Sequence, residues 1–295
     1  MELRTSKDCR DAYREILQGY TYVAEKDLYV KHFKEADLGY LDSLYKQCEK
    51  KVQDLGVSSE RERIKFLKEE DYWNEQEEEE YLAQRMAVVD AYAFKEKLTD
   101  PEQVKNFKEE IKRQEDLLQK IEEERRQLVE PTVESFCDKK INESYVRVAL
   151  FKDEKLKEPL YSKDEFDDVS FLELAELVKT YNKAISKHKD RNIKRIGICH
   201  FFLNAFLMAD NDPFKFFGTN VLEMTVYQQN LFSKGKYNKY ILEEGKEPPE
   251  ALYEQLDIGG LDEIVTWFDT ANIQIKQERR QQSAQMKGQS AQRGR

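Results

Sequence analysis

Two stretches of heptad-spaced apolar residues in the middle of the chain constrain its fold more than any other feature. The longer stretch alternates steps of three and four residues and has two polar interruptions, Gln114 and Arg125. This spacing places the apolar side chains on one face of a helix, as in a coiled-coil seam. The pattern predicts a helix of about 28 residues, roughly 42 Å long at 1.5 Å per residue. The seam positions are Val104, Phe107, Ile111, Gln114, Leu118, Ile121, Arg125 and Leu128.

The shorter stretch precedes the longer one and has the same spacing. Its positions are Leu82, Met86, Val89 and Ala93, and Thr99-Asp100-Pro101 separates the two stretches. Proline suits the first position of a helix, and Asp100 would cap it. We expect the two helices to fold back near residue 99 as a charged antiparallel hairpin that packs seam to seam and projects from a globular body. Because a heptad seam can also close between two chains, self-association through this hairpin is a second possibility.

The rest of the chain predicts a mainly α protein. The 295 residues include only 11 Gly and 6 Pro, too few for the tight corners of an all-β sandwich or barrel. Two short β-prone runs, residues 20–24 and 28–33, flank a polar turn and predict an N-terminal β-hairpin. Residues 131–275 read as a helical lobe, with an amphipathic helix over 171–185, an apolar run over 196–209 and an aromatic helix over 220–242. Capping boxes are expected at Ser59 with Glu62 and at Ser162 with Glu165.

Boundaries between these patterns divide the chain into four parts. They are residues 1–72 with the β-hairpin and helices, 73–130 with the helical hairpin, 131–275 with the lobe, and 276–295. The last part has Met286 as its only large apolar residue and a local charge of +5, from six Lys/Arg against Glu278. The remaining residues therefore carry −15, because the whole chain carries −10. A segment of this composition buries no core and is predicted to be disordered.

The basic tail has three interpretations: a plain disordered terminus, a segment that docks on an acidic protein surface, or a nonspecific tether to nucleic acid. Lys and Arg side chains neutralise phosphates and release counterions. The tail has no aromatic residue for base stacking, so sequence-specific recognition is not expected. The candidate contact residues are Arg279, Arg280, Lys287, Arg293 and Arg295.

No pattern in the chain predicts a catalytic, cofactor or metal site. The three histidines, His32, His188 and His200, are scattered without metal-ligand spacing. Nucleotide-binding and hydrolase motifs are absent from the sequence. We therefore expect a protein that is not an enzyme and takes no cofactor. Neighbouring Cys199 and His200 diverge by about 100° on a helix and do not form a catalytic pair.

Two acidic segments resemble cation sites but fit simpler interpretations. Residues 210–212 read Asp-Asn-Asp, yet Phe214 and Lys215 stand where a calcium loop needs an oxygen ligand and a glycine. This segment is predicted to be a turn. The glutamates at 77–80 point in different directions on a helix, which indicates a solvated acidic face.

The four cysteines, Cys9, Cys48, Cys137 and Cys199, lie far apart and form no CxxC pair. They are expected to be free thiols in a reducing compartment. No segment reaches the ~18 consecutive apolar residues that span a bilayer, and the first residues have no apolar signal core. We therefore expect no membrane contact.

A dense group of aromatic residues in the C-terminal lobe has two interpretations. Core packing explains an aromatic stripe on a helix most often. Tyr and Phe are also enriched at protein interfaces, and their density here exceeds what a small lobe easily buries. The candidate partner-binding residues are Phe214, Phe216, Phe217, Tyr227, Phe232 and Tyr237.

Two stretches of the chain carry a family resemblance. Residues 19–37 read GYTYVAEKDLYVKHFKEAD, and residues 192–242 include NIKRIGICHFFLNAF, DPFKFFG and LEMTVYQQNLFSKGKYNKYIL. Together they resemble uncharacterised virion-associated or tail-assembly proteins of large tailed bacteriophages. The resemblance implies a non-enzymatic structural or morphogenesis protein that contacts other virion or assembly proteins, in the virion or the host cytoplasm. It supplies no functional residues.

Two alternatives to this function remain open from the sequence. One is a nucleic-acid-associated factor that uses the basic tail as a tether. The other is an enzyme of an unfamiliar kind, with carboxylates at residues 210–212.

Overall fold

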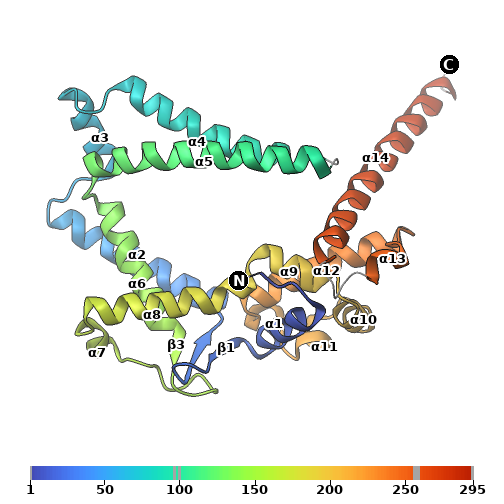
Figure 1. The fold of residues 1–295 in the computed structure, drawn as a ribbon, viewed down its shortest axis with the longest axis horizontal. Coiled ribbons are helices and arrows are strands. Elements are labelled where there is room, and N and C mark those ends of the chain that lie inside the picture. The colour runs from blue at the N-terminus through green and yellow to red at the C-terminus, as the bar shows by residue number, and fades with distance from the viewer. Residues whose placement is uncertain (1, 96–97, 99–100, 255–259, 294–295) are drawn as a thin grey trace. The chain divides into compact units, whose positions relative to one another are not determined.

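The structure is a computed structural model that describes residues 2–95, 98, 101–254 and 260–293 (Figure 1). The side chains of residues 101, 102, 104, 105 and 280–293 are not described. Helices form most of the chain, and one small antiparallel sheet lies near the N-terminus. The predicted mainly α class is confirmed. None of the helices in the described ranges is long and apolar enough to cross a membrane.

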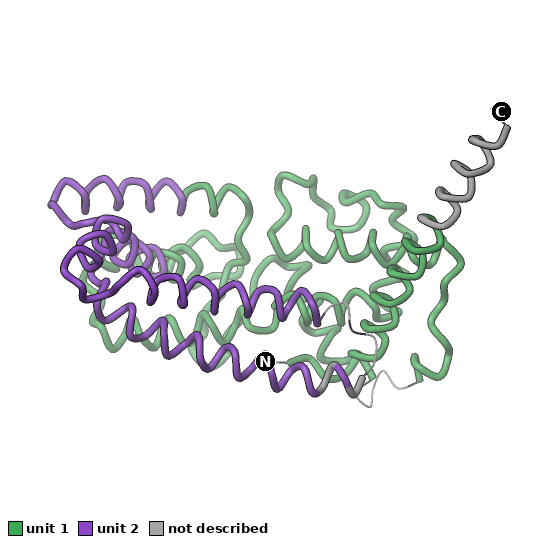
Figure 2. The backbone as a smooth tube through the Cα atoms, turned by 90° about the horizontal axis from the view of Figure 1, so that it is seen from above, with its two compact units in different colours: residues 1–40, 143–295 green, residues 41–142 purple. Residues whose placement is uncertain are grey.

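The chain folds into two compact units, and each is described by itself (Figure 2). Unit 1 joins residues 1–40 with residues 143–295, and unit 2 comprises residues 41–142. Two helices therefore pass from one unit into the other, α2 (Glu35–Asp54) and α6 (Val133–Ala149). The four-part division made from the sequence stays a prediction.

Unit 1 begins with a helix and the predicted β-hairpin. Gly19 ends the first helix in the left-handed conformation, with φ of 79°, and the chain turns directly into the sheet. In the hairpin Tyr20 lies opposite Lys31 and Val23 opposite Leu28. A third strand of two residues extends the sheet, and its short length gave no sequence signal. These elements are α1 (Ser6–Gln18), β1 (Tyr20–Val23), β2 (Leu28–Lys31) and β3 (Leu150–Phe151), in the sheet order β1-β2-β3.

The rest of unit 1 is a helical lobe around one apolar core. Phe202, Phe206 and Phe268 are completely buried there. The apolar run 196–209 is two helices rather than one, because α9 ends at Gly197 and α10 begins at His200. The helices are α7 (Lys163–Asp167), α8 (Phe171–Ile185), η1 (Ser186–His188), α9 (Asp190–Gly197), α10 (His200–Met208), α11 (Pro213–Phe217), η2 (Val221–Glu223), α12 (Val226–Glu243), α13 (Glu250–Tyr253) and α14 (Leu261–Arg293).

Residues 276–293, predicted to be disordered, continue α14 up to Arg293. The physical reason lies in the preceding residues: Ile264, Phe268, Ala271 and Ile275 are buried and anchor the first part of α14. Extending an existing helix avoids the costly nucleation step, and the tail is rich in Gln, Lys, Arg and Ala, which favour a helix.

Unit 2 consists of helices. The predicted capping box of Ser59 with Glu62 is present, as is that of Ser162 with Glu165 in unit 1. Pro101 is the first residue of α5, as predicted, whereas the predicted cap Asp100 and the turn near residue 99 lie outside the described residues. The helices that lie wholly in this unit are α3 (Glu60–Glu69), α4 (Glu75–Lys95) and α5 (Pro101–Val129).

Candidate functional site

Helices α4 and α5 form the predicted antiparallel hairpin, and they lie side by side in Figure 1. Phe94 near the end of α4 packs on Phe107 near the start of α5, with ring centroids 5.2 Å apart. At the other end Glu78 of α4 binds Arg125 of α5. The predicted seam of α5 is the face that meets α4, because Ile111 is buried there. Its other described positions are half-buried: Phe107, Gln114, Leu118, Ile121, Arg125 and Leu128.

The predicted seam of α4 does not meet α5. Leu82, Met86 and Val89 are 48%, 57% and 55% exposed, and Ala93 is exposed too. These four residues are termed the outer stripe below. At 3.6 residues per turn they lie about 150° around the helix from the half-buried face. The prediction of seam-to-seam packing is therefore wrong for α4. The half-buried face consists of Glu77, Tyr81, Gln84, Val88, Ala91 and Lys95, and Glu78 is half-buried on the flank between this face and the outer stripe.

Polar residues in the α5 seam explain this rotation of α4. Buried polar groups need hydrogen-bond partners. Gln84 Nε2 donates to Gln114 Oε1 at 2.7 Å, and Glu78 accepts from Arg125. Turning the outer stripe toward α5 would carry Gln84 away from Gln114.

Arg125 joins three helices of unit 2. It donates through Nε and Nη2 to the two carboxylate oxygens of Glu78 at 3.0 Å each, and through Nη1 to Glu60 at 2.7 Å. Its guanidinium lies 4.6 Å from the centre of the Tyr81 ring. Burial would raise the pKa of Glu78, but hydrogen bonds from Arg125 and Trp73 outweigh it and hold that pKa below its usual value. Arg125 is thus a structural clamp at a position that the heptad pattern marks as an interruption.

Five of the six candidate partner-binding aromatics pack within unit 1. Phe216 packs edge-on against the core residues Phe202 and Phe206, with centroids 5.6 and 5.5 Å away. Phe214, by contrast, is 65% exposed. The core-packing interpretation therefore fits every member except Phe214. The four other packed members are Phe217 against Phe232 at 6.2 Å, Tyr237 with its hydroxyl on Asp269 at 3.1 Å, and Tyr227 beside two histidines at 5.0 Å.

Exposed apolar side chains gather on residues 207–222, which the sequence analysis did not single out as a unit. Asp210 and Asn211 are left-handed, with φ of 50° and 60°, and Asp212 Oδ1 accepts from the Phe214 amide at 2.9 Å to cap α11. The predicted turn at 210–212 is confirmed. Both ends of this segment keep large side chains in solvent. The exposed members are Leu207 at 40%, Met208 at 86%, Phe214 at 65%, Val221 at 53% and Leu222 at 85%.

In the basic tail, the structure describes the side chain of one candidate contact residue, Arg279. Its Nη2 donates to Glu244 Oε1 at 2.7 Å, and its guanidinium lies 5.2 Å from the centre of the Tyr240 ring. Arg279 therefore already binds within unit 1. The side chains of Arg280, Lys287 and Arg293, and the whole of Arg295, lie outside the described residues. The nucleic-acid interpretation of the tail stays a prediction.

Two histidines that the sequence analysis treated separately meet in the interior of unit 1. The hydroxyl oxygen of Thr21 lies 3.0 Å from Nε2 of His32 and 3.0 Å from Nε2 of His188. The same hydroxyl donates to Glu15 Oε2 at 3.0 Å. Thr21, His32 and His188 are each 1% exposed. No sequence signal reveals this cluster, because His32 directly follows β2 and His188 ends η1, far away in the chain.

The hydrogen count in this cluster makes Nε2 of each imidazole a hydrogen-bond donor to Thr21. The single Thr21 hydroxyl proton goes to Glu15, so each imidazole must supply its own hydrogen to the Thr21 oxygen. Nδ1 of His32 and Nδ1 of His188 have no hydrogen-bond partner within the described chain. Burial, together with the nearby His188 and Lys187, holds the pKa of His32 well below its usual value.

This depressed pKa predicts a loss of stability in mild acid. The unfolded state gains a proton on His32 near pH 6.5, while the folded state does so only at lower pH. Stability from His32 is therefore complete above pH 6.5 and falls as the pH drops below it. Urea unfolding at pH 7.5 and 5.5 should show this loss in the wild type and a smaller loss in His32→Gln. The exposed His200→Gln serves as control, and an equal pH effect in His32→Gln would contradict the prediction.

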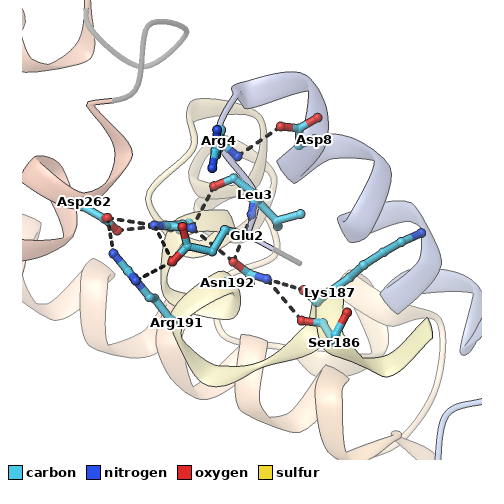
Figure 3. A network of polar contacts seen from close by, with 10 residues as sticks. Glu2, Leu3, Arg4, Asp8, Ser186, Lys187, Arg191, Asn192 and Asp262 are labelled. Atoms are coloured by element: carbon cyan, nitrogen blue, oxygen red, sulfur yellow. Dashed lines mark hydrogen bonds and ion pairs between the residues drawn. The ribbon is translucent and has the colours of Figure 1, made fainter. Parts of the chain in front are cut away.

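A polar network holds the first residues of the chain against α9 and α14 (Figure 3). Arg195 donates through Nε and Nη2 to the Asp262 carboxylate at 2.8 and 2.7 Å, and through Nη1 to the Leu3 carbonyl at 2.8 Å. Arg191 bridges Glu2 and Asp262 at 2.5 Å each. Burial would raise the pKa of Asp262, but hydrogen bonds from the two arginines outweigh it and lower that pKa to about 2. The network serves as a clamp between distant segments.

A pocket of unit 1 with a volume of about 390 Å³ is lined by charged and polar residues of α9, α12 and α14, together with Ile193 and Tyr237. Its cations are already paired within the chain. Lys194 lies 3.6 Å from Asp190, and Lys234 lies 3.6 Å from Asp269 and 3.9 Å from the centre of the Tyr237 ring. The described residues contain no cluster of three or more His, Cys, Asp or Glu side chains that could hold a metal ion.

All four cysteines are free thiols, as predicted. Cys48 and Cys137 come together in a small apolar core of unit 2 with Val52 and Val133. Burial is the main reason that the pKa of the Cys137 thiol is raised, to about 12. A thiol with a raised pKa is a poor nucleophile, so this pair has a packing role.

No protein-family model, curated protein or solved structure matches this chain.

Proposed function

We propose that this chain is a non-enzymatic structural or assembly protein of a tailed bacteriophage that acts through protein–protein contacts. The observation that carries the proposal is the apolar face of α4. This helix has no buried residue, and its large apolar side chains remain about half in solvent. Exposed contiguous apolar surface in a soluble chain marks a contact site. The exposed members of this face are Leu82, Met86, Val89 and Ala93.

Residues 207–222 supply a second exposed apolar segment, in unit 1. Met208 and Leu222 are the most exposed large apolar residues there. An apolar side chain in solvent forgoes the roughly 1.5–3 kcal/mol that burial against a partner would supply. The segment therefore supports a role in contact with other proteins.

The polar clusters of the chain favour a structural role over catalysis. Arg125, Arg195 and Thr21 each use their hydrogen-bonding groups to join separate elements of their own unit. Side chains that use their hydrogen-bonding groups in this way stabilise the fold and do not present a reactive atom to a substrate.

The bacteriophage assignment itself rests on the resemblance of residues 19–37 and 192–242. It makes other virion or assembly proteins the partners, and the virion or the host cytoplasm the location. Composition and geometry add nothing to this part of the proposal.

A genetic test addresses the proposal in the phage that carries the gene. An early stop codon should leave DNA replication normal and reduce the yield of infectious particles by at least an order of magnitude. Wild-type protein supplied from a plasmid should restore the yield. Leu55→Glu, at an 82% exposed position away from the outer stripe, serves as the control variant and should also restore it. A normal yield without the protein would overturn the proposal.

A further inference from the structure

Lys234 of α12 lines the pocket of about 390 Å³ that α9, α12 and α14 form in unit 1. Its side chain is only 11% exposed, against 34% for Lys194 of α9 in the same pocket. The volume lies at the low end of the range for ligand pockets, so the pocket suits a small molecule. A small molecule bound there lies next to Lys234.

The stem of Lys234 packs directly on the backbone of α9. A methyl group added at Gly197 would lie 2.8 Å from Lys234 Cγ, so the close approach of the two helices requires glycine there. Asn238, one turn later on α12, donates from Nδ2 to the Gly197 carbonyl at 2.6 Å. Lys234 Nζ lies 3.9 Å from the centre of the Tyr237 ring. These contacts hold the amine of Lys234 in place.

The counter-ion of Lys234 leaves its nitrogen free to react. Asp269 Oδ1 lies 3.6 Å from Nζ, which is an ion-pair distance and longer than a hydrogen bond. Burial is the main reason that the pKa of Lys234 is lowered. Asp269 opposes this shift, Lys194 adds to it, and Asp190 opposes it more weakly. At pH 7 Lys234 therefore has more neutral amine than an exposed lysine, and the neutral amine is the nucleophile.

We propose that Lys234 is a covalent binding site for a small aldehyde, which it holds in this pocket as a protonated imine. The lone pair of the amine attacks the carbonyl carbon and forms the new C–N bond. Asp269 relays protons from the nitrogen to the carbonyl oxygen, which leaves as water. Of the three ammonium hydrogens, two leave in the water and one stays on the imine nitrogen. The step therefore needs no oxidant or reductant.

The surroundings of Lys234 suit an imine better than other lysine modifications. A protonated imine keeps the positive charge on the nitrogen, so the ion pair with Asp269 and the contact with the Tyr237 ring are kept. An acyl group would remove that charge and both interactions. The imine is a reversible complex and requires no turnover. This inference goes beyond the proposed function and does not depend on it.

Reductive alkylation of the full chain with propionaldehyde and cyanoborohydride at pH 7 tests the site. Cyanoborohydride reduces protonated imines and so records which lysines have formed one. Lys236 is the internal reference, because it is exposed on the same helix and its Nζ also lies over an aromatic ring, that of Phe232. Peptide mass spectrometry should find Lys234 alkylated roughly threefold or more faster than Lys236. An equal or slower reaction of Lys234 would overturn the proposal.

The preference for Lys234 must also depend on the folded chain. In denaturing urea the pocket is lost, so Lys234 and Lys236 should react at the same rate. A preference that persists in urea comes from the local sequence and would count against the site.

Two charge variants separate activation of Lys234 from simple access to it. Lys194→Gln removes the cation that lowers the pKa of Lys234 and should slow its alkylation relative to Lys236 by roughly twofold. Asp190→Asn removes an anion that raises this pKa and should speed the alkylation. Asp190 is 80% exposed, and both variants should keep the far-UV circular dichroism of the wild type. If both variants leave the ratio unchanged, or move it in the same direction, Lys234 is merely accessible and the proposal is wrong.

Discussion

Replacing Arg125 with alanine should lower the free energy of unfolding of unit 2 by about 3 kcal/mol, because it leaves two glutamates without their cation. Glu78 loses both of its 3.0 Å hydrogen bonds from Arg125, and its side chain is only 14% exposed. The Glu60 carboxylate loses its 2.7 Å partner as well. A carboxylate held in low dielectric without its cation costs far more than a broken surface pair.

The two tryptophans allow this loss to be assigned to unit 2. Trp73 lies in unit 2 and Trp267 in unit 1, and they are the only tryptophans of the chain. In a Trp267→Phe background, urea unfolding followed by fluorescence reports on Trp73 and therefore on unit 2. Arg125→Ala should shift this transition to lower urea.

Arg126→Ala is the matched control for Arg125→Ala. Arg126 is the next residue of α5, its side chain is 57% exposed and it pairs within its own helix with Glu123. Its loss should cost less than about 1 kcal/mol. Adding Glu78→Gln to Arg125→Ala should recover part of the lost stability, since a neutral amide removes the stranded charge. A change within 1 kcal/mol of the parent for Arg125→Ala would contradict the clamp, at the precision typical of such measurements.

Arg125 also shows how far the sequence predicts the hairpin. The heptad steps place Arg125 on the face of α5 that meets α4, and this placement is confirmed. The steps do not identify its partners, because Glu78 and Glu60 are 47 and 65 residues away in the sequence. A spacing pattern reports which residues share a face of one helix. It carries no information on which side chain of another helix satisfies a polar group.

The same limit explains why the α4 prediction is wrong. Apolar periodicity alone favours burial of Leu82 and Met86 against α5. Hydrogen bonding of Gln84 to Gln114 instead favours the observed rotation of α4. Polar pairing outweighs apolar burial here because the unpaired polar groups would cost more. Sequence periodicity cannot weigh these two effects without knowing the pairs.

For the candidate partner-binding aromatics, the sequence predicts a surface for partners, whereas the structure buries most of these rings. The aromatic density of residues 214–237 is real, but ring contacts such as Phe216 on Phe206 turn most of it inward. Phe214 remains outside, since α11 is short and is capped at both ends by turns. Composition reveals how much apolar surface a segment has, and only the packing of α10, α11 and α12 decides which part stays exposed.

Replacing Asp262 with alanine should lower the free energy of unfolding of unit 1 by about 3 kcal/mol, because the buried Arg195 would keep only the Glu2 carboxylate, 4.0 Å from its Nη2. The Arg195 side chain is 5% exposed and gives Asp262 two hydrogen bonds, at 2.8 and 2.7 Å. The spacing and capping patterns of the sequence assign no role to Arg195. Its partner lies 67 residues later, at the start of α14.

Fluorescence of Trp267 in a Trp73→Phe background should report this loss, with the measurement made at pH 7. The pKa of Asp262 is lowered from 3.8 to about 2, so its contribution is complete above about pH 4 and disappears as the pH falls toward 2. At pH 7 the ionised pair contributes fully. Below pH 2 the wild type and Asp262→Ala should therefore converge in stability.

Arg191→Ala separates the buried pair from the exposed one. Arg191 also contacts Asp262, but its side chain is 55% exposed, and its removal leaves the Arg195 pair in place. We expect a loss below about 1 kcal/mol. Combining Asp262→Ala with Arg195→Met should recover part of the loss, because the double variant has no stranded charge in the core. If the double variant is less stable than Asp262→Ala alone, the hydrogen bond from Arg195 to the Leu3 carbonyl, rather than the ion pair, is the main stabilising contact of the network.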